Sequence, residues 1–149
     1  MSTGVIFIRY AVVFLAVGIG ASFAVTALQA RFDSVVGSSA QLMVPAMIAA
    51  LVEGQQFARA HGRKPDSREI WRFTWIATAI AVGLNVAMAF GGQGYLPEFE
   101  KLAVAPVFSK QFMILLGLYA GGYLLCNRFF AGLGVGNQLS LMKDRDGAE

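Results

Sequence analysis

The sequence has few of the residues that soluble enzymes use for chemistry. Charged residues make up 14% of the chain, against about 25% in a typical soluble protein. Its 149 residues include one cysteine, Cys126, and one histidine, His61. A lone cysteine cannot form an intramolecular disulfide, and a zinc site needs three or four converging ligands. We therefore expect no metal site, no bound cofactor and no catalytic residues, and we interpret the protein as not being an enzyme.

Long uncharged runs take the place of the missing charges. They contain 21, 19, 25 and 17 residues and are bounded by Arg9 and Arg31, Asp33 and Glu53, Arg72 and Glu98, and Lys110 and Arg128. A bilayer core about 30 Å thick needs about 20 apolar residues of helix, and backbone groups in lipid must bond within their own helix. The sequence predicts an all-α integral membrane protein with four spans, at about 10–28, 35–52, 73–90 and 111–127.

These spans and their connections use nearly the whole chain, which indicates a single transmembrane domain over residues 1–149. Between the second and third spans lies a loop at 53–72, and a tail follows at 128–149. An alternative for the first span is a cleaved signal peptide, because Ser22-Phe23-Ala24 is a small-x-small sequence. Its uncharged run is longer than a signal peptide's apolar region of about 7–15 residues, so we expect it to be retained.

The distribution of cations predicts the orientation, since lysine and arginine near span ends are retained in the cytoplasm. The N-terminus, central loop and tail together hold nine cations: Arg9, Arg59, Arg63, Lys64, Arg68, Arg72, Arg128, Lys143 and Arg145. The opposite side holds three: Arg31, Lys101 and Lys110. We therefore expect an antiparallel four-helix bundle with both termini in the cytoplasm.

Local signals divide the middle of the chain. Pro45 removes one helical hydrogen bond, which predicts a kink or a late helix start in the second span. The helical pattern then continues about two turns beyond the membrane until Gly62, where a left-handed residue can close the helix. Asp66 followed by Glu69 is typical of a capping box and predicts the start of the third helix there.

The same region carries a resemblance. The run Glu53-Gly54-Gln55-Gln56-Phe57, the sequence His61-Gly62-Arg63-x-Pro65, and then Glu69 and Trp71 resemble a functionally uncharacterised family of small four-helix bacterial inner-membrane proteins. The resemblance covers the overall layout and is specific over about residues 49–72. It implies a four-helix fold and a location in a bacterial cytoplasmic (inner) membrane. It implies no activity, so no functional residue is carried over.

Small residues recur at helical spacing and predict faces where helices approach closely. These candidate packing or partner faces are Gly18 and Ser22; Ala46, Ala50 and Gly54; and Gly117 and Gly121. The last pair forms a GxxxG sequence, which is compatible with packing inside the bundle or with a dimer face.

Two polar residues are candidates for a functional site. Glu53, at the inner edge of the second span, is a possible proton or cation site, because ionisable groups at membrane depth often have a function. The alternative is a carboxylate that is solvated by water or paired with Arg72 or Arg128. Asn85, near the middle of the third span, is compatible with a pore or substrate site, or with a hydrogen bond to another helix.

The central cations Arg59, Arg63, Lys64, Arg68 and Arg72 are possible contacts for anionic lipid headgroups. The net charge of +3 and the pI near 9.3 do not indicate nucleic-acid binding, because the cations lie at span ends instead of along one stripe.

Three roles follow from these patterns. The first is an accessory or structural subunit that packs against a larger membrane protein complex, because few ionisable groups lie at mid-membrane depth and small-residue faces are abundant. The alternative is a small homo-oligomeric transporter or channel that uses Asn85, Pro45 and the polar run at 37–41. The third is a membrane scaffold that interacts with anionic lipid. The expected partners are membrane lipid and another integral membrane protein or a second copy of the chain.

Overall fold

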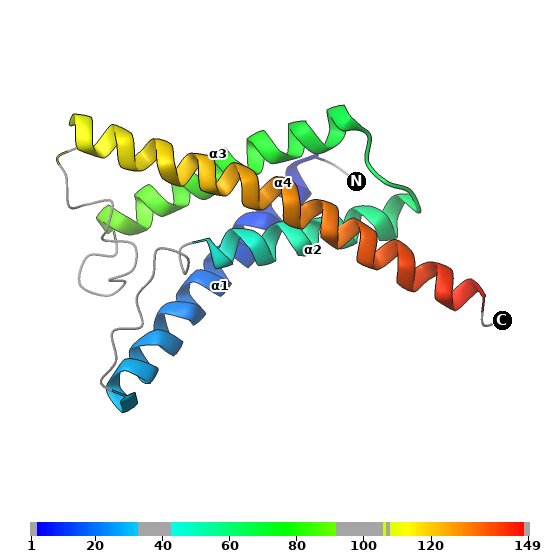
Figure 1. Ribbon diagram of the computed structural model, residues 1–149, viewed down its shortest axis with the longest axis horizontal. Helices are drawn as coiled ribbons and strands as arrows, with labels where there is room; N and C mark the ends of the chain where they lie inside the picture. Colours follow the sequence, from blue (N-terminus) through cyan, green and yellow to red (C-terminus); the bar gives the residue numbers. More distant parts are fainter. Residues whose placement is uncertain (1–2, 33–42, 92–105, 107, 148–149) are drawn as a thin grey trace.

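The computed structural model of the protein describes residues 3–32, 43–91, 106 and 108–147. They form four helices: α1 (Thr3–Phe32), α2 (Val44–His61), α3 (Ser67–Gly91) and α4 (Lys110–Asp146). Every regular element within those ranges is a helix, so the fold is all-α as predicted (Figure 1).

The turn between α2 and α3 has the predicted local structure. Gly62 adopts the left-handed conformation with φ 60°, and its N–H donates to the carbonyl oxygen of Ala58 at 2.8 Å. The backbone N–H of Asp66 donates to the Glu69 carboxylate at 2.9 Å, and the N–H of Glu69 donates to the Asp66 side chain at 2.7 Å. These two bonds form a capping box, so both predicted helix ends are confirmed.

Helices α1 and α3 extend beyond the spans expected from sequence at both ends, and α2 and α4 differ more strongly from theirs. Helix α2 begins at Val44 with Pro45 in its first turn, which is the late start that the proline predicts. Residues 35–42 of the predicted second span lie outside the described residues. The fourth span was expected to end at residue 127, but α4 continues to Asp146 through three glycines of the predicted tail. At 1.5 Å per residue α4 is about 55 Å long, so it extends well beyond a bilayer core about 30 Å thick.

Helices α3 and α4 lie side by side and run in opposite directions (Figure 1). Near the middle of α3, Thr78 bonds to Asn127, and near its end the ring of Phe90 lies 6.4 Å from that of Phe112. Residue numbers therefore rise along one helix as they fall along the other.

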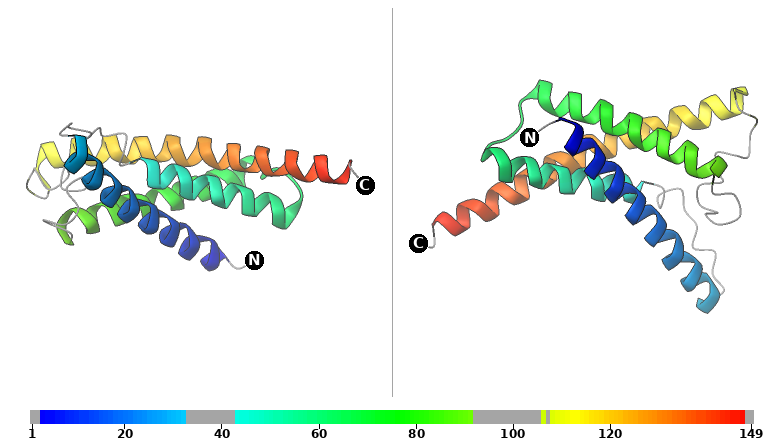
Figure 2. Two further views of the ribbon diagram at one scale, coloured as in Figure 1. Left: turned by 90° about the horizontal axis from the view of Figure 1, so that it is seen from below. Right: turned by 180° about the vertical axis from the view of Figure 1, so that it is seen from behind.

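Helix α2 runs in the same direction as α4. Met43 lies against Gly122, and Arg59 bonds to Gln138. Helix α2 therefore lies beside residues 122–138, toward the C-terminal end of α4. Figure 2 shows α2 and α4 crossing at an angle.

Helix α1 runs opposite to α4 and contacts the other helices through its N-terminal half. Tyr10 bonds to Asn127, and Phe14 contacts the ring of Tyr123. Beyond this contact α1 diverges, and its C-terminal end points away from α3 and α4 (Figures 1 and 2). The shared core therefore lies where the N-terminal half of α1 crosses the other three helices.

The closest helix approach is between α2 and α4. A Cβ atom built on Gly54 would overlap the carbonyl oxygen of Ala131, and one built on Gly134 would overlap the carbonyl oxygen of Leu51. Glycine at both positions lets the two backbones touch, as small residues do at close helix crossings in membranes.

Three helices are long and apolar enough to cross a membrane, considering the described residues alone. The apolar segments are Ile6–Ala24 of α1, Ser67–Gly91 of α3 and Lys110–Asp146 of α4. Helix α2 is not among them, since its second half contains Glu53, two glutamines, Arg59 and His61. This composition is consistent with a small membrane protein.

Replacing Gly134 with alanine should destabilise the protein, because the new Cβ would force α2 and α4 apart. Overpacking of this kind costs about 1–3 kcal/mol. Gly136→Ala is the matched control, since nothing lies within 4 Å of a Cβ there and alanine favours a helix by about 1 kcal/mol over glycine. The thermal unfolding midpoint in detergent should fall for Gly134→Ala and hold or rise for Gly136→Ala. Equal shifts would contradict the close crossing.

Candidate functional site

A buried ion pair joins α1 to α2 in the region where all four helices come together. Arg9 donates from Nε and Nη2 to the two carboxylate oxygens of Glu53, at 2.5 and 2.7 Å. The Glu53 side chain is 4% exposed and that of Arg9 is 29% exposed. A two-pronged arginine–carboxylate pair is among the stronger protein hydrogen bonds. Both groups need it, because burying either charge without a partner would be costly.

The partner of Glu53 differs from those weighed in the sequence. Arg72 and Arg128 were the partners expected, but the structure pairs Glu53 with Arg9 instead. The guanidinium of Arg128 lies 5.7 Å from the centre of the Trp71 ring. The partner of Glu53 depends on how α1 crosses α2. Arg9 and Glu53 are 44 residues apart along the chain, so the sequence does not indicate that they meet.

A pocket of about 250 Å³ lies beside this ion pair. Most of its wall is apolar, and the lining comes from all four helices and from the α2–α3 turn. The apolar lining residues are Ile6, Phe7, Gly54, Phe57, Ala60, Pro65, Ile70, Phe73, Ala131 and Val135. The polar ones are Arg9, Glu53, His61, Glu69 and Arg72.

One side of the pocket is built by packing around Phe57. The His61 ring stacks on Phe57 with centroids 4.3 Å apart, and the Arg63 guanidinium lies 5.5 Å from the ring centre. Arg63 also binds Glu69 through two contacts of 2.8 Å. That hydrogen bond, with the nearby negative charge, raises the pKa of the Arg63 guanidinium. The negative charge of the Glu69 carboxylate is thus already balanced by Arg63.

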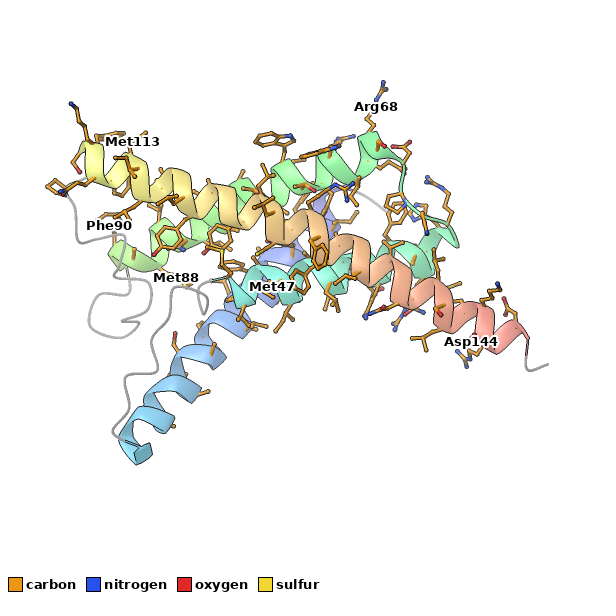
Figure 3. All side chains as sticks on the ribbon, viewed as in Figure 1. Met47, Arg68, Met88, Phe90, Met113 and Asp144 are labelled. Atoms are coloured by element: carbon orange, nitrogen blue, oxygen red, sulfur yellow. The ribbon has the colours of Figure 1, made fainter. Side chains whose placement is uncertain are left out.

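The five cations of the central loop do not lie together in one cluster. Arg59 bonds to Gln138 at 3.0 Å, and Arg63 is paired with Glu69. Lys64, Arg68 and Arg72 are exposed, and Figure 3 shows Arg68 pointing away from the helices. Only Arg72 among the five lines the pocket, and it has no ion pair with any carboxylate in the part of the chain that the structure describes.

Buried polar side chains link the helices farther from the pocket. The Tyr10 hydroxyl donates to Asn127 at 2.7 Å, and the Asn127 amide donates to Thr78 at 3.2 Å, so α1, α4 and α3 are joined. Asn85 donates to the Tyr123 hydroxyl at 2.5 Å. Asn85 is 1% exposed, and its Oδ1 atom has no hydrogen-bond partner among the described residues.

The small-residue faces are placed in two different ways. Gly18, Ser22, Ala46, Ala50 and Gly54 are buried. Gly117 and Gly121 are exposed, and a Cβ atom on either would have nothing within 4 Å. The structure therefore does not place this pair inside the bundle, which was one interpretation of the sequence. A contact with a separate helix stays a prediction.

Several residues that build the site were not predicted from the sequence. Arg9 was assigned to orientation alone, and Tyr10, Tyr123 and Asn127 received no role. Gly134 was placed in the tail, although Ala131, Gly134 and Gln138 follow helical spacing and no proline interrupts the helix there. Polar residues at span edges and an uninterrupted helical pattern were the available signals.

Comparison of the chain with protein-family models, with curated proteins and with solved structures found no match. The family resemblance thus rests on the loop residues alone and stays a prediction. No group of three potential metal ligands occurs within the described ranges.

Removing one partner of the ion pair should destabilise the protein, because the other charge stays partly buried. We expect Arg9→Gln and Glu53→Gln each to cost up to about 3 kcal/mol. The double variant should lose less stability than the sum of the single losses. Unfolding in detergent, followed by tryptophan fluorescence, measures all three. Strictly additive losses would show that the two charges do not interact.

Proposed function

We propose that the chain is a small protein of a bacterial cytoplasmic membrane that crosses the bilayer four times and serves as an accessory subunit. In this role it packs against a larger integral membrane protein and catalyses no reaction of its own. The helix directions, the placement of charge and one exposed helix face support the proposal.

The helix directions support four crossings. Helices α1 and α3 both run opposite to α4, so a chain that crosses through both must return across the membrane between residues 33 and 66. Helix α2, which runs with α4, provides the later part of this return. The nine cations on the side of the central loop then favour cytoplasmic termini.

The outward face of α4 is the observation that carries the accessory role. Gly117 and Gly121 are exposed there, and the large side chains of Ile114, Leu118 and Leu125 flank them, each 64–70% exposed. Glycine in a helix costs about 1 kcal/mol relative to alanine, and at these positions no contact among the described residues uses the missing side chain. A flat strip with apolar edges suits close contact with another membrane helix.

Filling this strip should prevent partner binding without harming the fold. We expect a membrane protein of unrelated sequence to co-purify with the wild-type chain in mild detergent at fixed stoichiometry, as measured by mass spectrometry. The variant with Gly117→Leu and Gly121→Leu should lose it. Ala87→Leu, an exposed site on α3, is the control and should retain it. Equal retention by both variants would show that the strip is not the interface.

One observation favours the homo-oligomeric transporter or channel as a second candidate. Asn85 keeps an unpartnered acceptor atom within the helical core, and polar groups inside a membrane often mark a pathway. Serines 38 and 39 and Gln41, the other expected lining residues, lie outside the described residues. A homo-oligomer with solute flux in liposomes, abolished by Asn85→Leu, would favour this role over the accessory one.

A further inference from the structure

The pocket beside Arg9 and Glu53 has a composition that neither proposed role uses. Its wall is mainly apolar, yet it holds two arginines and two carboxylates. Both carboxylates are already bound by cations, Glu53 by Arg9 and Glu69 by Arg63. Arg72 is left as a lining cation with no ion pair among the described residues. Because Glu69 is paired with Arg63 from outside the lining, the pocket and its ion pairs together have three arginines for two carboxylates.

Arg9 adds directed hydrogen-bond donors to this charge. A guanidinium has five N–H donors, and Glu53 occupies the Nε and Nη2 atoms. The Nη1 amino group has no partner within the described part of the chain. Glu53 balances the charge of Arg9 and fixes its orientation, so Arg9 can offer these donors to an anion while Arg72 supplies the attraction.

The position of the pocket indicates where its ligand comes from. Trp71 and Trp75 are exposed on the same part of α3 that supplies Arg72, and indole rings concentrate at the membrane–water interface. An anionic group at this depth is most readily the head of an amphiphile whose chain contacts the apolar wall. The volume of about 250 Å³ is slightly below the 300–1,000 Å³ or so of pockets for drug-sized ligands, which suits a single head and the start of one chain.

We infer that this pocket binds the anionic end of a membrane amphiphile, a phosphate or carboxylate attached to an acyl chain, through Arg72 and the Nη1 group of Arg9. The inference rests on the membrane placement of the protein and not on the accessory role. It is narrower than attraction of lipid by the whole central loop, because only Arg72 of the five loop cations lines the pocket.

The test measures binding to the purified full-length chain in neutral detergent by native mass spectrometry and thermal shift. Four probes separate the sources of the ligand: lysophosphatidic acid, oleate, lysophosphatidylcholine and glycerol phosphate. We expect one or both of the anionic amphiphiles to bind, and the tighter of the two identifies the head group. Equal binding of the zwitterionic lipid, or equally tight binding of glycerol phosphate, would overturn the inference.

Matched variants separate the pocket from the general charge of the loop. Arg72→Gln should weaken binding of the anionic amphiphile about fivefold, the effect of one cation near an anionic lipid surface. Arg68→Gln removes the same charge one turn earlier on α3, outside the pocket, and should leave affinity nearly unchanged. Ala60→Phe should reduce binding by filling the pocket. Equal losses from Arg68→Gln and Arg72→Gln, or no loss from Ala60→Phe, would refute the site.

Discussion

Gly54 and Gly134 both lie where α2 crosses α4, Gly54 against the backbone of Ala131 and Gly134 against that of Leu51. This close approach sets the position of α2 against the rest of the molecule. With α2 held there, Glu53 faces Arg9 and Arg59 reaches Gln138. The pocket also depends on this crossing, because Gly54, Ala131 and the ion pair all line it. A larger residue at either glycine would shift these contacts together.

Polar contacts between helices give the remaining helices their register. In lipid, helices gain no hydrophobic energy by associating, so close packing and hydrogen bonds must provide specificity. Asn127 is bonded to both α1 and α3, and Asn85 joins α3 to Tyr123 of α4. Most polar groups in the core are therefore used for holding helices together. This use is what the proposed structural role requires, and the exposed strip of α4 and the pocket are two surfaces that it leaves open to other molecules.

The sequence was sufficient to predict the helical class and the α2–α3 turn, because both depend on local signals. Uncharged runs indicate spans, and the conformation of Gly62 and the Asp66–Glu69 capping box require only neighbouring residues. The pairing of Glu53 with Arg9 and the packing of Gly54 and Gly134 on the facing backbone depend on how distant helices cross, which residue spacing does not encode. The length of α4 was missed for another reason. Three glycines, which weaken a helix in water, were interpreted as part of a tail, whereas the helix continues through all three and one of them, Gly134, packs against α2.

Four membrane crossings with both termini in the cytoplasm are the central claim, and topology reporters test it most directly. A green fluorescent protein and an alkaline phosphatase are each fused after Lys64, after Lys101 and after Glu149, since the first is fluorescent only in the cytoplasm and the second active only outside it. The account predicts fluorescence after Lys64 and Glu149 and phosphatase activity after Lys101. Phosphatase activity after Glu149, with no fluorescence there, would contradict it.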